Sequence, residues 1–546
     1  MQAFAALLER LILTPSRNSK LTLIVDYLRR TPDPARGWAL AAITGDLAIA
    51  SLKPAMIREL VATRVDPILF NLSYDYVGDL AETVSLIWPT RSGANRAPDL
   101  AEVVDTLHQS TRAQAPAHAE RWLDALDPAG RWALLKFITG GLRVGVSARL
   151  ARQAVADLGN VPVTEIEELW HGLKAPYEDL FGWLEGRAPK PFPEIKAPYR
   201  PAMLAHPLLS KSERLEANDL DPALISPADF AAEWKWDGVR VQLASEEGTT
   251  RLYTRTGDDI SGAFPDLLGG ALFDATLDGE LLIRSPQGGV ASFNELQQRL
   301  NRKTVTPKQI AERPAFLRAY DLLTERAEDL RSLTFAQRRQ RLERFVVSLP
   351  PGSPIDLSPL VPFEDAIALE DLRRNPPTPE IEGLMLKRWD APYVAGRPAG
   401  LWYKWKRDPH LIDAVLMYAQ RGHGKRSSYY SDFTFGVWRS APNGEGGGGD
   451  ELAPVGKAYF GFTDEELLLL DKYVRDHTRE RFGPVRSVTA NKDEGLVLEV
   501  AFEGLQRSPR HKSGVAMRFP RIHRIRWDKP AADADRMETL EKMLEA

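Results

Sequence analysis

Apolar residues recur at helical spacing through the first part of the chain. In the opening stretch they stand three or four positions apart, at Phe4, Leu7, Leu8 and Leu11. With Glu9 and Arg10 between them, this spacing predicts an amphipathic helix and not a signal peptide. Long Ala/Leu/Arg-rich stretches such as residues 121–138 continue the pattern, with turns at Pro and Gly. We therefore expect the N-terminal part to be all-α.

The pattern changes after a proline-rich segment. Five prolines fall between Arg187 and Pro201, and they deny helical hydrogen bonds and favour an extended chain. Short β-branched and aromatic runs follow, separated by Gly, Asp and Pro, with one helical stretch at 292–303. The predicted strands are 239–244, 250–256, 275–283, 383–389 and 401–407. We expect an α+β domain here.

The pattern of the last part of the chain predicts strands and turns. Predicted strands lie at 413–420, 434–440 and 496–504, and the loop 443–451 is too glycine-rich to hold a fold. A small β-barrel fits this pattern best. The resulting domain prediction is 1–200, 201–408 and 409–546.

Composition narrows the classes of function. The 546 residues are 43% hydrophobic and 27% charged, as in an ordinary globular protein of several domains. The absence of cysteine excludes disulfides, Cys-ligated zinc, iron-sulfur clusters and thiol catalysis. No apolar run is long enough to predict a membrane span, so we expect a cytoplasmic protein, associated with the nucleoid if bacterial. The net charge of −4 argues against bulk coating of nucleic acid, although a local patch remains possible.

The most informative stretch runs from Glu233 to Arg240, with the sequence EWKWDGVR. Its lysine, Lys235, stands among aromatic residues at a strand end. We expect poor solvation to lower the pKa of this amine and make it a nucleophile. A surface strand with alternating charges is the alternative for this short motif alone.

The surrounding residues favour the first interpretation. K-x-D-G-x-R resembles motif I of the covalent nucleotidyltransferases, and especially of ATP-dependent DNA ligases, in which the lysine takes AMP. Six further stretches resemble the later motifs of that family, in the family's order. They are 252–267 with Arg255, 276–282 with Asp278 and Glu280, 316–323 with Tyr320, 382–387 with Glu382 and Lys387, 401–409 with Lys404 and Lys406, and 518–529 with Arg518, Arg521, Arg526, Asp528 and Lys529.

Two N-terminal stretches add to the resemblance. Residues 74–80 (YDYVGDL) and 139–147 (TGGLRVGVS) are similar to stretches of the helical DNA-binding domain that precedes the catalytic core in larger ATP-dependent DNA ligases. The resemblance implies three domains: a helical DNA-binding domain, an adenylation domain and a C-terminal OB-fold barrel. It also implies ATP as cofactor, nicked double-stranded DNA as partner, and a monomer.

The resemblance assigns roles around the nucleotide. It implies that Glu233 accepts a hydrogen bond from the adenine amino group, that Arg240 and Glu280 contact the ribose, and that Tyr320 stacks on the purine. The family usually has Phe at the last position, so the added hydroxyl leaves the local hydrogen bonding open. Arg397 stands seven residues before Lys404 where the family has six, which leaves its phosphate role open.

The remaining charged residues suit phosphoryl transfer. Such a transfer needs positioning and cations around spreading negative charge, which Arg255, Lys387, Lys404, Lys406 and the 518–529 arginines can supply. Glu280 and Glu382 are hard oxygen ligands of the kind that Mg²⁺ prefers. Residues 501–529 include eight Arg or Lys and only two acidic residues, which predicts a local cationic face for DNA.

We therefore predict an ATP-dependent DNA ligase that seals nicks through a lysyl-AMP intermediate in DNA repair or replication. An RNA ligase or a capping-type nucleotidyltransferase shares the Lys-x-Asp-Gly core, but neither explains the helical N-terminal domain. An NAD-dependent ligase is disfavoured because that family uses four zinc-binding cysteines. A non-catalytic scaffold that holds nicked DNA is the alternative outside enzymes. The residues do not distinguish a phosphate-contacting loop at 422–431 from a flexible turn.

Overall fold

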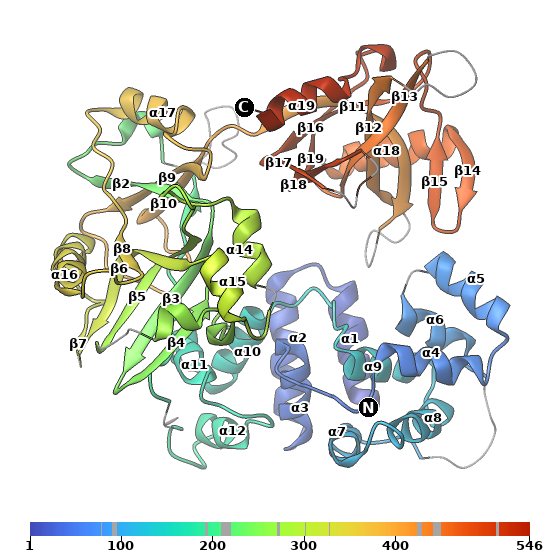
Figure 1. Ribbon diagram of the computed structural model, residues 1–546. Coiled ribbons are helices and arrows are strands. Elements are labelled where there is room, and N and C mark those ends of the chain that lie inside the picture. Colours follow the sequence, from blue (N-terminus) through green and yellow to red (C-terminus); the bar gives the residue numbers. More distant parts are fainter. Residues whose placement is uncertain are drawn as a thin grey trace. The chain divides into compact units, whose positions relative to one another are not determined.

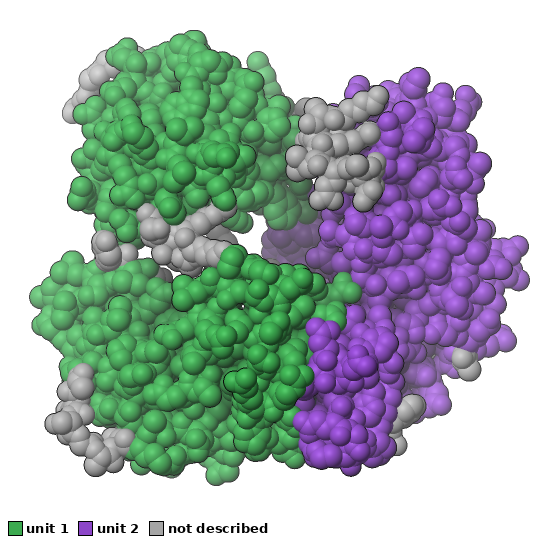
Figure 2. All heavy atoms as spheres, turned by 180° about the vertical axis from the view of Figure 1, so that it is seen from behind, with its two compact units in different colours: residues 1–154, 175–178, 409–546 green, residues 155–174, 179–408 purple. Residues whose placement is uncertain are grey.

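The computed structural model describes most of the chain, and Figure 1 shows its elements. Two compact units can be separated, as coloured in Figure 2. One contains residues 1–154, 175–178 and 409–546, and the other contains residues 155–174 and 179–408. The described residues are 1–77, 79–89, 96–191, 195–208, 220–269, 273–300, 302–326, 328–422, 429–440, 449–508, 511 and 513–545. Among them, no helix is long and apolar enough to cross a membrane.

The N-terminal region is helical, as its apolar spacing predicts. Phe4, Leu7, Leu8 and Leu11 are all buried on one side of α1. The helices are α1 (Gln2–Leu13), α2 (Arg17–Arg30), α3 (Ala35–Thr44), α4 (Pro54–Ala62), α5 (Pro67–Val77), α6 (Leu80–Ile87), α7 (Leu100–Gln109), α8 (Ala115–Ala125), α9 (Pro128–Thr139), α10 (Ala148–Gly159), α11 (Val163–Trp170) and α12 (Glu178–Leu184).

Both N-terminal stretches singled out by their sequence are held by lysines. Asp79 caps α6 by accepting from the Glu82 amide, and it also accepts from Lys136 Nζ at 2.5 Å. Lys136 lies in the last turn of α9, directly before residues 139–147. Within that loop, the Gly145 carbonyl accepts from the buried Lys20 Nζ at 2.8 Å. Asp79 and Gly145 are therefore both tied to neighbouring helices by lysines.

The second unit contains two β-sheets with separate apolar cores. One sheet has the order β1-β10-β9-β2, and the other has the order β4-β3-β5-β6-β7 with β8 paired to β6. All five strands predicted in this region are present, and so is the predicted helix, as α14. The strands are β1 (His206–Pro207), β2 (Phe230–Trp236), β3 (Val239–Glu246), β4 (Thr249–Thr254), β5 (Ala275–Ile283), β6 (Ala315–Glu325), β7 (Glu328–Asp329), β8 (Ile355–Leu357), β9 (Ile381–Arg388) and β10 (Trp402–Lys406).

Helices flank these sheets. α16 packs on β6 and β8, and its Phe335, Leu342 and Phe345 are buried. α17 contributes Leu369 to the core beneath β2, β9 and β10. The helices are α13 (Pro265–Leu268), α14 (Phe293–Leu300), α15 (Pro307–Glu312), α16 (Phe335–Ser348) and α17 (Ala366–Arg374), with short 3-10 turns at Pro222–Leu224 and Ser261–Ala263.

The C-terminal region is mostly β. Its larger sheet runs β13-β12-β11-β15-β14, and β16 joins β11 to β19. α18 and α19 contribute Leu470 and Leu540 to its core. The elements are β11 (His410–Arg421), β12 (Tyr430–Ser440), β13 (Asp450–Ala458), α18 (Asp464–Asp476), β14 (Thr478–Phe482), β15 (Val485–Val488), β16 (Val497–Phe502), β17 (Gly504–Arg507), β18 (Val515–Arg518), β19 (Arg521–Arg526), a 3-10 turn (Ala531–Asp533) and α19 (Met537–Glu545).

The three predicted C-terminal strands are present as β11, β12 and β16. The predicted glycine-rich loop and the segment 422–431 fall largely outside the described residues.

Candidate active site

Strand register brings the predicted lysines onto one face of the smaller sheet. Across β10, β9 and β2, one row reads Lys406, Gly383, Lys235, and the next reads Lys404, Met385, Glu233. Residues opposite one another in paired strands point to the same side of the sheet. Two motifs separated by about 170 positions along the chain therefore share one surface with the predicted nucleophile.

A β-bulge places Glu382 beside Lys235. The register between β2 and β9 shifts there, because Lys235 pairs with Gly383 and Trp236 pairs with Ile381, which leaves Glu382 as the extra residue. Bulges re-aim side chains in this way. The backbone at Gly383 has φ of 142°, and an added Cβ would lie 2.2 Å from the Trp405 carbonyl oxygen, so glycine is required. Glu382 thereby contacts Lys235 Nζ through Oε2, and Lys406 Nζ lies 3.5 Å from the same oxygen.

The structure corrects the expected pKa of Lys235. Burial does act to lower it, as predicted, but the carboxylates of Glu382, Glu280 and Asp237 outweigh burial, and the net pKa is raised. The sequence suggested only the aromatic neighbours and not the acids that strand pairing brings to the amine. Lys235 is therefore a cation in the structure without nucleotide, and it must lose a proton before it can attack.

Other predicted cations gather around the same face. The pKa of Lys404 is lowered by burial and by the like charges of Lys406, Lys235, Arg397 and Arg255. These like charges all act on Lys404, which favours binding of an anion near it. Arg255 is exposed just after β4, where its backbone carbonyl accepts from the Tyr199 hydroxyl at 2.5 Å. This cluster has the charge that a nucleoside triphosphate requires.

The larger sheet supplies a second row of polar residues. Across β3 and β5, Arg240 lies opposite Glu280. Burial raises the pKa of Glu280 to about 8; Lys235 and Arg240 oppose this effect, whereas Glu382 and Asp278 add to it. The Glu280 carboxyl is therefore mostly protonated at neutral pH in the structure without ligands.

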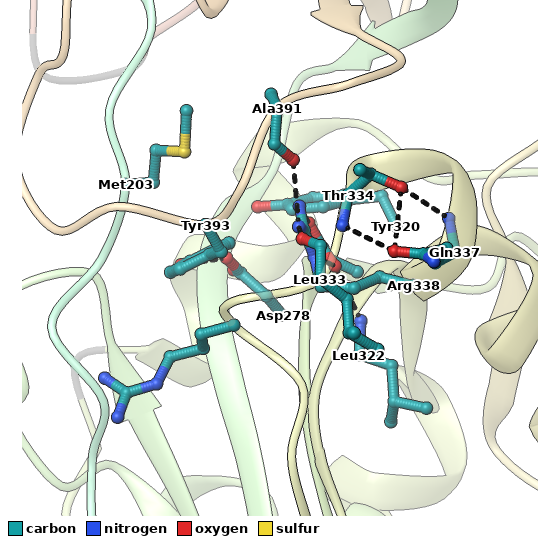
Figure 3. Close-up of polar contacts among 12 residues, drawn as sticks. Met203, Asp278, Tyr320, Leu322, Leu333, Thr334, Gln337, Arg338, Ala391 and Tyr393 are labelled. Carbon is teal, nitrogen blue, oxygen red and sulfur yellow. Dashed lines mark hydrogen bonds and ion pairs between the residues drawn. The ribbon is translucent and has the colours of Figure 1, made fainter.

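Internal partners hold Arg240. Its Nε and Nη2 donate to both oxygens of the fully buried Asp278, at 3.0 and 2.6 Å, and Nη1 donates to the Met203 carbonyl at 2.6 Å. Tyr393, which is labelled beside Asp278 in Figure 3, donates its hydroxyl to Asp278 Oδ2 at 2.6 Å. The same hydroxyl accepts from Arg240 Nη2 at 3.1 Å. Arg240 is thus rigidly oriented, with most of its donors already used.

A second bulge singles out Tyr320. Asp278 pairs with Asp321 and Gly279 with Ala319, so Tyr320 is the extra residue of β6. Its ring lies near two cations: Arg240, whose guanidinium carbon is 5.8 Å from the ring centroid, and Lys387, whose Nζ is 4.4 Å from it. A ring in this setting can stack on a purine. Lys387 is only 1% exposed and pairs with Glu233, so its charge serves the Glu233 side of the site and not the exposed cation cluster.

Glu233 is the buried acid of the site. It is 2% exposed and ion-paired with Lys387 and with Arg339 Nη1, the latter at 3.1 Å. Its Oε2, although close to Lys387, accepts no hydrogen bond from any residue that the structure describes. A buried acceptor without a hydrogen bond is costly and marks a position for a donor from a ligand. An exocyclic amino group would supply it.

The acids that could hold a metal ion are few. No group of three or more His, Cys, Asp or Glu side chains suited to a metal occurs in the described ranges. Glu280 and Glu382 nevertheless both lie close enough to Lys235 to raise its pKa. Mg²⁺ commonly binds one or two carboxylates together with substrate phosphates and waters, so this pair fits that ion and no all-protein cage is needed.

The predicted C-terminal arginines lie in the other compact unit. Arg518 ends β18 and Arg521 begins β19, and Phe519 between them has a positive φ of 51°. Arg526 donates to both oxygens of Asp528, which lowers the pKa of this carboxyl to about 2, and Lys529 Nζ donates to Asp413 at 2.7 Å. This motif is therefore assembled within the C-terminal domain.

The site also contains residues that sequence analysis missed. Arg338 and Arg339 begin the second turn of α16, and both are buried. Arg338 forms an ion pair with Asp321, next to Tyr320, and both side chains are fully buried. Figure 3 shows its contacts with the carbonyls of Leu333 and Ala391. The signal was available, because two adjacent arginines stand on the buried side of an amphipathic helix.

Paired carboxylates, a lysine nucleophile candidate and a surrounding cation cluster define a covalent nucleotidyltransferase-type site. Comparison with known families agrees. The family described as ATP dependent DNA ligase domain matches residues 202–406, and the one described as ATP dependent DNA ligase C terminal region matches residues 426–529.

Curated relatives extend the match beyond these domains. A probable DNA ligase of Koribacter versatilis is 28% identical over 587 residues, which span 100% of this chain and 96% of that protein. A DNA ligase of Halobacterium salinarum is 30% identical over 75% of this chain and 70% of its own length. A probable DNA ligase of Streptomyces coelicolor is 31% identical over 74% of this chain and 75% of its own length. The chain belongs to the ATP-dependent DNA ligases.

Solved structures agree on the fold. The structure named Pmar-Lig_Pre superposes with a TM-score of 0.57 over 96% of this chain and 99% of that chain, at 15% sequence identity. A helical N-terminal region, an adenylation domain and a mostly-β C-terminal domain therefore make up this DNA ligase. As a member of this family it uses ATP, binds DNA and seals nicks, and the comparisons do not favour an RNA ligase, a capping enzyme or a scaffold.

Proposed function

We propose that Lys235 is the nucleophile that accepts AMP from ATP. Its Nζ attacks the α-phosphorus, the bond from that phosphorus to the bridging oxygen breaks, and pyrophosphate leaves. AMP then passes to the 5′-phosphate of a nick, and the 3′-hydroxyl attacks this phosphate and expels AMP. The observation that carries the proposal is the position of Lys235 on one sheet face with Lys404 and Lys406, close to the carboxyl groups of Glu382 and Glu280.

Lys235 must give up a proton in the first step. Glu382 contacts the amine and is the nearest acceptor. The positive charge of Mg²⁺ bound with the nucleotide would weaken the hold of Glu382 on the lysine proton, which favours the neutral amine. Arg255, Arg397, Lys404 and Lys406 would bind phosphate oxygens from the cation cluster.

Glu280 and Glu382 are the proposed ligands of Mg²⁺. The ion, when bound, supplies charge that neutralises phosphate oxygens. Because the pKa of Glu280 is raised to about 8, binding of the ion requires loss of a proton from this carboxyl near neutral pH. Mg²⁺ affinity should therefore rise with pH up to about 8.

The adenosine part of ATP is assigned to the buried side of the site. Tyr320 would stack on the purine, Glu233 would accept from its amino group, and Glu280 and Arg240 would contact the ribose. Glu233 Oε2, which forms an ion pair with Lys387 but accepts no hydrogen bond from the described residues, supports this arrangement. The internal bonds of Arg240 leave it few donors, so we assign it mainly to shaping the ribose site.

We propose domain limits near residues 200 and 408 and an OB-type barrel for residues 409–546. The strand order around β11, β12 and β16 supports a barrel. Arg518 and Arg521 would reach the β- and γ-phosphates only during the first step, which requires the C-terminal domain to close and then reopen. The enzyme would act as a cytoplasmic monomer on nicks left by DNA repair or replication.

Labelled ATP tests the proposed function directly. Wild type incubated with α-labelled ATP and Mg²⁺ should become covalently labelled, and a chase with nicked duplex should release the label as sealing proceeds. A label that stays on the protein during the chase would contradict the proposed order of steps.

A further inference from the structure

Arg339 connects helix α16 to the buried acid of the nucleotide site. Its Nη1 lies 3.1 Å from Glu233 Oε1 and donates to the Ser358 carbonyl at 2.8 Å, and its Nε donates to Glu343 Oε1 at 2.8 Å. Arg339 is 5% exposed and Glu233 is 2% exposed, whereas the Glu343 side chain is 45% exposed. The guanidinium therefore extends from the surface acid to the interior, where Glu233 depends on it.

The contact fixes more than one side chain. Glu233 forms an isolated β-bridge with Leu360, two residues after the carbonyl that Arg339 holds, and the Val361 amide donates to the Ala232 carbonyl at 2.8 Å. A guanidinium can hold several acceptors at once because its donors lie in a rigid plane. Arg339 thus ties together the carboxylate and the segment that borders its strand.

The position of Arg339 is itself fixed. The neighbouring Arg338 donates to both oxygens of Asp321, at 2.8 and 3.0 Å, and both residues are fully buried. Thr334 and Gln337 form a capping box that starts the helix (Figure 3). The helix is consequently anchored to β6 next to Tyr320, and Arg339 approaches Glu233 from a rigid base.

The chemistry of a carboxylate between two cations determines which base it can recognise. An ionised carboxylate only accepts hydrogen bonds. It attracts the exocyclic amino group of adenine and repels the carbonyl oxygen that guanine carries at the same place. Lys387 pairs with one oxygen and Arg339 with the other, so the two cations fix the direction of the carboxylate.

We propose that Arg339 is a positioning residue for base selection, and that through Glu233 it sets the preference for nucleotides with a 6-amino group. The inference rests on the proposed role of Glu233 in the adenine site. Arg339 has no assigned contact with the nucleotide, and its effect is transmitted by holding Glu233 Oε1.

The test compares Arg339→Met with wild type in covalent labelling by ATP and by purine riboside triphosphate, which lacks the 6-amino group. A hydrogen bond to a charged group should give wild type a roughly ten- to hundredfold preference for ATP in kcat/KM. R339M should lose most of this preference, because labelling by ATP falls while labelling by the analogue changes little. A merely structural defect would instead lower both rates by the same factor and leave the ratio unchanged, which would overturn the inference.

Two further variants complete the design. Arg344→Met removes an exposed arginine of the same helix, whose side chain donates only to a backbone carbonyl among the bonds that the structure describes, and it should keep the wild-type ratio. Arg339→Lys restores the charge without the planar fork and should give a ratio between wild type and R339M, which keeps the test valid if R339M folds poorly. R339K and R339M ratios that both equal the wild-type ratio would overturn the inference.

Glu233→Gln separates this inference from the proposed function. If E233Q loses the preference and R339M keeps it, only the role of Arg339 is wrong. If E233Q also keeps the wild-type preference, the proposed role of Glu233 itself is wrong.

Discussion

Glu280 gives a quantitative test of the site. Burial raises its pKa from 4.5 to about 8, so the folded protein keeps a proton on this carboxyl that the unfolded chain loses. At 1.36 kcal/mol for each pKa unit, the difference corresponds to about 5 kcal/mol of stability, as an upper bound because the neighbouring charges titrate together. Glu280→Gln imitates the protonated form and should remove this dependence.

Proton linkage determines whether the stability of wild type rises or falls with pH. Below pH 4.5 both states hold the proton, and the contribution of Glu280 to stability is fully present. Between 4.5 and about 8 the folded state binds more protons than the unfolded state, so the stability of wild type falls as pH rises. Relative to E280Q, the free energy of unfolding of wild type should fall at a rate that approaches about 1.4 kcal/mol per pH unit, and this decrease should level off above about pH 8.

Urea unfolding of the ligand-free protein at pH 5 to 8.5, followed by tryptophan fluorescence, measures this difference. Glu380→Gln is the matched control, since Glu380 lies just before β9 and its side chain forms no ion pair among the described residues. E380Q should follow the wild-type curve. If the unfolding free energies of wild type and E280Q change with pH in the same way across the whole range, Glu280 does not titrate near 8 and the description of the buried acid is wrong.

Three further predictions concern the rest of the chain. Arg338→Met should reduce the free energy of unfolding by about 3–5 kcal/mol, because it leaves the buried Asp321 charge without its partner. Calorimetry measures this change, and an unfolding temperature equal to that of wild type would show that the pair is unimportant. Arg518→Ala and Arg521→Ala should slow covalent labelling by ATP far more than sealing of a pre-adenylated nick, and equal losses in the two assays would rule out a role confined to the first step. Binding of nicked duplex should weaken with salt by about 0.9 log unit per log unit of salt for each phosphate contact, so a salt-independent affinity would refute binding through the cationic face.

Local patterns predicted the elements of this protein well. The amphipathic spacing of Phe4 to Leu11 predicted α1, and the β-branched and aromatic runs predicted β3, β4, β5, β9 and β10, but not β6, which holds Tyr320. Motifs such as EGLMLK also indicated candidate residues, and strand pairing places Glu382 of this motif beside Lys235. These signals depend on neighbours along the chain, and a single sequence contains them directly.

The geometry of the site could not be predicted in the same way. The bulges that single out Glu382 and Tyr320 depend on register between strands far apart in sequence. The raised pKa of Lys235 follows from acids that only pairing brings near, which is why reasoning from its aromatic neighbours gave the wrong sign. Likewise, Lys387 looked like a phosphate ligand until the fold placed it in a buried pair with Glu233.

The central claim is that Lys235 carries AMP. Wild type should take up label from α-labelled ATP, and peptide mapping should place the adenylate on Lys235. Lys235→Arg should keep the fold and take up no label, since a guanidinium is a far poorer nucleophile than an amine. Label found on a different lysine, or normal labelling of K235R, would contradict the account.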